Sequence, residues 1–248
     1  MKQRNIWLIG FGIILLVLSL LLLGVHYVFF HDAYWLEKYV FFELAFIPID
    51  VIVVTLILES VLEARERKER LEKMNMVIGL FYSEVGVSIL RKVAARDPGI
   101  AKYRADLARA GDLSPAEYGK LKATLATLPY SPDISREDLA AFKKVLIGHR
   151  GFLVRLLENP TLLEHEEFTD TLRAVFHLTE ELDYRRDFPA LPDTDVIHLA
   201  GDVKRAYGRL VLEWLRYMRY LKEHYPYLYS LAMRTNPFDP ESTPVVRA

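Results

Sequence analysis

The feature that most constrains this chain is a run of 20 residues without a charge that begins at Ile6. An α-helix of that length spans about 30 Å, which is the thickness of the hydrocarbon core of a bilayer. A cleaved signal peptide is the competing interpretation, because Lys2 and Arg4 precede the run. However, the run is longer than the apolar region of a signal peptide, about 7–15 residues, and residues 24–30 lack a small-x-small cleavage site. The sequence therefore predicts an uncleaved transmembrane helix over about residues 6–26.

A second apolar segment, about residues 39–62, predicts a second span and hence a two-helix transmembrane hairpin. Glu43, Asp50 and Glu59 interrupt this segment, and Pro48 is expected to bend it. Aromatic side chains crowd the connection between the two spans, as in the belt at a membrane interface: Tyr27, Phe29, Phe30, Tyr34, Trp35, Tyr39, Phe41 and Phe42. The chain is thus predicted to be a multi-pass protein of the cell membrane, with the lipid bilayer as its first partner.

Basic residues flank both ends of the predicted hairpin and predict its orientation. Lys2 and Arg4 precede the first span, and a cluster of basic residues follows the second: Arg65, Arg67, Lys68, Arg70 and Lys73. The loop between the spans carries only Lys38, against two acidic residues. The positive-inside rule therefore predicts that the N- and C-termini are both cytoplasmic. Arg65, Arg67, Lys68 and Arg70 are placed to contact lipid headgroups at that interface.

Two acidic residues inside the second span are candidates for a polar site within the membrane. Asp50 is expected near the bilayer midplane, where an aspartate costs about 2.5–3.5 kcal/mol on insertion scales. Glu43 lies seven residues earlier and projects from the same side of the helix. In a ring of subunits these carboxylates would line a cation pathway. The alternative is structural, with Glu43 reaching the interface, or paired with His26, and Asp50 neutral against a neighbouring helix.

The rest of the chain is predicted to be all-α, because no alternation of apolar and polar residues lasts long enough for a strand. We expect four segments: the hairpin over residues 1–62, a helical stalk over 63–96, a cytoplasmic bundle of five to seven helices over 97–236, and a flexible tail over 237–248. The stalk carries an apolar stripe that enters the core of the bundle: Leu71, Met74, Ile78, Phe81 and Val85.

Capping residues predict where several helices of the bundle begin. Ser114 and Glu117, with Pro115 between them, are typical of a capping box at the start of a helix. Ser135 is expected to cap a helix that runs to about Glu158. Further helices are predicted over about residues 162–184 and 193–224. The second is long, and its predicted inner face is apolar: Leu199, Val203, Tyr207, Leu210, Trp214, Met218 and Leu221.

Two pairs of side chains in these last helices could bind a metal ion. His177 and Glu181 are four residues apart, as are His198 and Asp202, so each pair shares one face of its helix. Histidine nitrogens and carboxylate oxygens from two facing helices are ligands that first-row transition metals accept. Both pairs could equally be surface pairs or hydrogen bonds between helices, so no cofactor is assigned.

Charge and motifs exclude several classes of function. The net charge is −1, so the chain as a whole has no electrostatic attraction for nucleic acid, and none is expected as a partner. With no cysteine, disulfides, thiol nucleophiles and Cys-ligated metals are excluded. Phosphate-binding glycine loops, HExxH and GxSxG motifs are absent from the sequence, which argues against those enzyme classes.

The function predicted first is a membrane anchor that holds a helical cytoplasmic domain for protein interaction, sensing or scaffolding, assembled as a homo-oligomer. The second is a small oligomeric cation channel whose pore is lined by the second span, with Glu43 and Asp50 facing the axis. The third is a helical hydrolase or metal protein that uses His177, Glu181 and His198. The protein partner and the ligand are not specified by the sequence.

Overall fold

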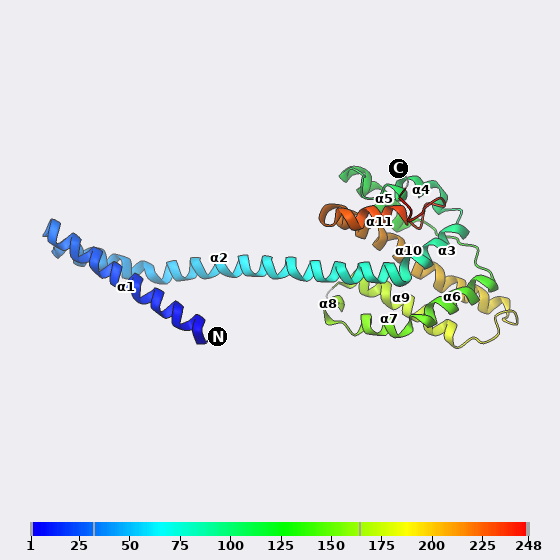
Figure 1. The fold of residues 1–248 in the computed structure, drawn as a ribbon, viewed down its shortest axis with the longest axis horizontal. Coiled ribbons are helices and arrows are strands. Elements are labelled where there is room, and N and C mark those ends of the chain that lie inside the picture. The colour runs from blue at the N-terminus through cyan, green and yellow to red at the C-terminus, as the bar shows by residue number, and fades with distance from the viewer. Residues whose placement is uncertain (1, 32, 164, 247–248) are drawn as a thin grey trace. The chain divides into compact units, whose positions relative to one another are not determined.

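The computed structural model describes residues 2–31, 33–163 and 165–246, and these residues form helices and turns without a strand (Figure 1). The all-α fold class predicted from the sequence is confirmed. The chain divides into two compact units, Met1–Glu66 (unit 1) and Arg67–Ala248 (unit 2).

Unit 1 contains helix α1 (Lys2–Phe30) and the first part of helix α2 (Ala33–Phe81). The chain leaves α1 through His31, whose φ of 51° is left-handed and whose N–H donates to the carbonyl of Tyr27 at 2.9 Å. A residue in this conformation typically ends a helix. α2 continues through Pro48, so the proline ring leaves one carbonyl without its helical donor but does not end the helix.

At the turn, each helix extends beyond its predicted span. α1 runs to Phe30 instead of about residue 26, and α2 starts at Ala33 instead of about residue 39. Aromatic rings stack across the turn, with the centroid of His26 5.0 Å from that of Trp35, and Trp35 5.2 Å from Tyr39. These contacts join the end of α1 to the start of α2. The aromatic residues predicted to mark an interface therefore lie largely within the two helices.

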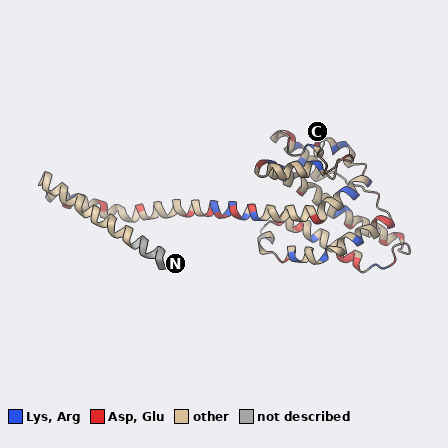
Figure 2. Ribbon diagram, in the orientation of Figure 1, with Lys and Arg blue, Asp and Glu red and all other residues tan. Residues whose placement is uncertain are grey.

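The described large apolar side chains of α1 from Phe11 onward and of α2 as far as Leu62 are exposed, apart from that of Leu23, which is partly buried. The structure contains two helical segments long and apolar enough to cross a membrane, and none of the apolar stretch in either is buried within the protein. Figure 2 shows the same stretches as nearly free of charge, followed along α2 by a band of alternating basic and acidic residues. That band includes Arg65, Arg67, Lys68 and Arg70.

Unit 2 is a helical bundle around one long helix, α10 (Asp193–His224), which packs along α9 (Glu166–Asp183). The remaining elements are η1 (Tyr82–Gly86), α3 (Val87–Arg96), η2 (Ile100–Tyr103), α4 (Arg104–Ala108), α5 (Pro115–Thr127), α6 (Arg136–Gly148), α7 (Arg150–Leu157), α8 (Pro160–Leu163) and α11 (Pro226–Arg234). The whole predicted inner face of α10 is buried: Leu199, Val203, Tyr207, Leu210, Trp214, Met218 and Leu221.

The end of α2 enters this core along the predicted apolar stripe. Met74, Ile78, Phe81 and Val85 are buried, whereas Leu71 is exposed. Gly79 lets the Tyr217 side chain of α10 approach, because a Cβ at this position would lie 2.5 Å from the tyrosine oxygen. The helix then widens into the π-helical turn η1.

Unit 2 has more helices than the predicted five to seven, since eight α-helices, α4 to α11, lie between residues 104 and 234 in the described residues. The helix predicted from Ser135 to about Glu158 is interrupted at His149, which ends α6 and precedes α7. The capping box predicted at Ser114 is present, and Ser135, predicted to cap its helix, does so in a capping box with Asp138.

The C-terminal segment is described only as far as residue 246, so residues 247–248 of the predicted tail lie outside the described part. Within the segment predicted to be a flexible tail, Phe238 is buried in the core. Arg91 of α3 also donates to the carbonyl of Thr235 at 2.9 Å and to Ser242 Oγ at 3.5 Å. This part of the tail is therefore packed against α3.

Candidate functional site

The two histidine–carboxylate pairs predicted from the sequence come together between α9 and α10. His177 and Glu181 lie in the last two turns of α9, and His198 and Asp202 lie in the first three turns of α10. The two helices are consecutive and pack along each other, so their facing sides meet near the connection that joins them. We call these four residues the His–carboxylate cluster.

Asp202 is the centre of the cluster. Its Oδ2 lies 3.5 Å from His198 Nε2 and 3.6 Å from His177 Nε2, and His198 Nε2 lies 3.7 Å from Glu181 Oε2. One donor atom from each of Glu181, His198 and Asp202 lies within 4.8 Å of the others. Each of the three measured distances exceeds the 2.7–3.2 Å typical of an N–H···O hydrogen bond.

The side chains of the cluster differ sharply in exposure. The Asp202 side chain is only 2% exposed, whereas those of His177 and His198 are about half exposed, at 47% and 53%. Arg205 lies 2.8 Å from Asp202 Oδ1, but Oδ2 is buried and has no hydrogen-bond partner among the described residues. A buried carboxylate oxygen in this state loses the hydration it would have in the unfolded chain.

Arg185, in the connection after α9, holds the acidic side of the cluster in place. It makes two hydrogen bonds to Asp195, at 2.8 and 3.1 Å, and further hydrogen bonds to the carboxylate and the carbonyl of Glu181. These bonds lower the pKa of Glu181 and of Asp195 below the usual carboxylate range. Both groups are therefore ionised at neutral pH.

Sequence reasoning missed Arg185, Asp195 and Arg205 as members of this site. Arg185 follows Glu181 by four residues and Arg205 follows Asp202 by three, spacings at which side chains meet on a helix. Asp170, seven residues before His177, does not join the cluster, because it pairs with Arg209 at 3.1 Å.

The other candidate residues lie on α2. Glu43 and Asp50 are both exposed on the apolar part of this helix, and their place in a pore stays a prediction. Arg65, Arg67, Lys68 and Arg70 are exposed in the charged band. Their contact with headgroups stays a prediction.

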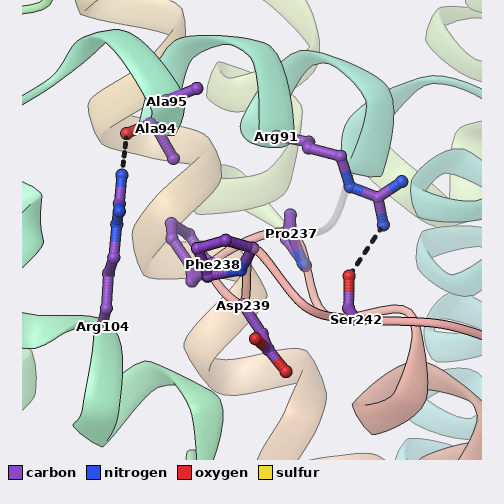
Figure 3. Close-up of a pocket in the computed structure, with 9 residues that line it drawn as sticks. Arg91, Ala94, Ala95, Arg104, Pro237, Phe238, Asp239 and Ser242 are labelled. Atoms are coloured by element: carbon purple, nitrogen blue, oxygen red, sulfur yellow. Dashed lines mark hydrogen bonds between the residues drawn. The ribbon is translucent and has the colours of Figure 1, made fainter.

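A cleft of about 350 Å³ lies between α3 and the C-terminal segment (Figure 3). Two arginines line it, but both donate to neighbouring groups of the protein, Arg104 to the carbonyl of Ala94 at 2.8 Å and Arg91 to Ser242. Asp239 adds a carboxylate to the same lining. The cleft therefore lacks the concentration of unshared positive charge that an anion site requires, and it is a weaker candidate than the cluster.

Comparison with known proteins places the chain in a family. The model of the C-terminal helical domain of uncharacterized protein MJ1433 matches residues 70–234, and that of the N-terminal helical domain of MJ1433 matches residues 2–62. The chain is 42% identical over 231 residues to uncharacterized protein MJ1433 of Methanocaldococcus jannaschii, and the match covers 93% of each protein. No solved structure matches the chain. The chain belongs to the MJ1433 family, whose two domains fall within unit 1 and unit 2.

Proposed function

We propose that this protein is anchored in the cell membrane by a hairpin of α1 and the first half of α2, and that unit 2 is a cytoplasmic helical domain for protein interaction or sensing. The observation that carries the proposal is the exposure of the described large apolar side chains in the apolar stretches of both helices, all except Leu23, which is partly buried. Soluble monomers rarely expose contiguous apolar patches beyond a few hundred Å². A bilayer would cover these side chains and remove them from water.

The length and flanks of the helices support this placement. The apolar stretch Gly10–Phe29 has 20 residues, which as a helix match a hydrocarbon core of about 30 Å. Lys2 and Arg4 precede the apolar stretch of α1, and the charged band follows the apolar part of α2. The excess of basic residues at both ends favours a cytoplasmic location for the N-terminus and for unit 2.

Self-association is part of the proposal because of Glu43 and Asp50. Both are exposed on a helix that the proposal places in lipid, where an uncovered carboxylate is costly. Contact between copies of α2 would cover them. The same observation favours a second candidate, a cation channel in which these residues line the axis of a ring. Light scattering in detergent distinguishes the two, because a monomer or dimer cannot form a central pore.

The absence of native cysteine permits a direct test of topology. Tyr34→Cys places a thiol next to the turn of the hairpin, and Tyr184→Cys places one on unit 2, both at exposed tyrosines. In intact cells, a maleimide that cannot cross membranes should label Tyr34→Cys and leave Tyr184→Cys unlabelled until the membrane is opened. Labelling of Tyr184→Cys in intact cells would refute the cytoplasmic location, and the cysteine-free chain is the control.

A further inference from the structure

We propose that the His–carboxylate cluster binds a divalent transition-metal ion such as Zn²⁺ between α9 and α10, with His177, Glu181, His198 and Asp202 as its ligands. The proposal goes beyond the membrane anchor and does not depend on it, because all four residues belong to unit 2. Imidazole nitrogens together with carboxylate oxygens form a ligand set that Zn²⁺ accepts.

The spacing of the donor atoms fits such an ion. Ligand bonds of about 2.0–2.2 Å in a tetrahedron place neighbouring donor atoms about 3.3–3.5 Å apart. Asp202 Oδ2 lies 3.5 Å from His198 Nε2 and 3.6 Å from His177 Nε2, and the Glu181–His198 distance is 3.7 Å. The donor atoms of Glu181, His198 and Asp202 all lie within 4.8 Å of one another, so rotations of these side chains would bring them to the separations that the ion requires. His177 joins this group through its approach to Asp202 Oδ2. The same distances are too long for direct hydrogen bonds.

The burial of Asp202 is the second, independent observation that points to a ligand. Its Oδ2 is buried, faces both imidazoles and has no hydrogen-bond partner among the described residues. Buried carboxylate oxygens are normally bonded, and each exception needs an explanation. A metal bond to Oδ2 would supply the missing partner and would leave the contact of Oδ1 with Arg205 unchanged.

The charges around the cluster are compatible with a cation. Three carboxylates, those of Glu181, Asp195 and Asp202, stand against two guanidinium groups, Arg185 and Arg205, so the cluster keeps a net negative charge when its imidazoles are neutral. Arg185 also donates a hydrogen bond to the carboxylate of Glu181, which fixes the position of this ligand. Partners that orient ligating carboxylates in this way typically strengthen metal binding.

The exposure of the two imidazoles gives an ion a path to the site. The half-exposed His177 and His198 form the outer side, and the buried Asp202 forms the base. An ion held by all four residues would join the end of α9 to the start of α10. Because it would bind the folded protein in preference to the unfolded chain, it should raise the melting temperature of unit 2.

The test is zinc binding by the untagged full-length protein in detergent, after removal of metal with a chelator. Isothermal titration should show one strong Zn²⁺ site per chain, and Co²⁺ should give the visible absorption of a four-coordinate ion. Loss of a group that only orients a metal ligand typically lowers metal affinity by about 10–100-fold. Loss of a ligand itself, in His177→Ala or His198→Ala, should therefore lower zinc affinity by at least about 100-fold. Zinc should also raise the melting temperature of the wild type but not of these variants.

His224→Ala is the matched control, because His224 is exposed on the same helix and stacks on Tyr220 instead of facing a carboxylate. Its zinc affinity should equal that of the wild type. Both cluster histidines are half exposed, so their variants are expected to fold, which circular dichroism checks. A wild type that binds zinc no more tightly than His198→Ala, or an equal loss in His224→Ala, would overturn the proposal.

Discussion

At the scale of single residues, the central feature is the carboxylate of Asp202. Its spacing in the sequence predicted which face of the helix it occupies but not its burial or its neighbours. The four-residue spacing of His198 and Asp202 places both on one face of a helix, as does that of His177 and Glu181. Spacing alone does not reveal that the two pairs face each other, or that Asp202 is buried while the histidines are exposed. Those facts depend on how α9 and α10 pack, which is set by apolar residues elsewhere on both helices.

Arg185 gives a prediction about pH. It holds the pKa of Glu181 and of Asp195 below their usual values, so its contribution to stability is complete above a pH of about 4 and is lost as the pH falls through the lowered values. Arg185→Met should therefore lower the free energy of unfolding by about 1–3 kcal/mol at pH 7, and the difference from wild type should shrink toward pH 3.

Thermal unfolding of the full-length protein in detergent, followed by circular dichroism across this pH range, measures the effect. Arg186→Met is the matched control, because Arg186 is the exposed neighbour of Arg185. It should change stability little at any pH. A loss in Arg185→Met that stays constant from pH 7 to pH 3 would contradict the assignment of the effect to the two carboxylates.

At the scale of helices, features that depend on nearby residues of the same helix were predicted correctly. The capping box at Ser114 and the buried stripe of α10 follow from spacing along one helix, and both are present. The interruption at His149 and the π-helical turn Tyr82–Gly86 carry no such signal. The π-helical turn packs against another helix, with the Tyr82 ring close to Trp214 and Tyr217.

The π-helical turn gives a prediction about stability. A Cβ on Gly86 would lie 2.5 Å from Tyr82 Cδ1 and 3.0 Å from Phe81 Cε1, and both rings are buried. Gly86→Ala should therefore destabilise the protein by about 1–3 kcal/mol through overpacking. Gly119→Ala is the control: Gly119 is exposed within α5 with nothing near its Cβ position, so alanine should add up to about 1 kcal/mol of helix stability. Equal melting temperatures for the two variants would contradict the tight packing at η1.

At the scale of the whole molecule, the pattern of apolar residues predicted the fold class, and composition along the chain predicted a division between an apolar and a mixed-charge part. The structure is helical throughout its described residues, and its two units divide at Glu66, close to the end of the apolar sequence. Function could not be predicted to the same depth. The surroundings of the side chains that could carry chemistry, such as Asp202, depend on contacts between helices. Membership in the MJ1433 family describes two helical domains and does not specify an activity.

The central claim is that the exposed apolar stretches of α1 and α2 lie in a bilayer. The most direct measurement is the distribution of the untagged, full-length protein after cell lysis and ultracentrifugation, with alkaline carbonate washes to strip proteins bound only at the surface. We predict that the protein stays in the membrane pellet through these washes and leaves it only with detergent. Recovery of folded protein in the aqueous fraction, before or after the carbonate wash, would contradict the account.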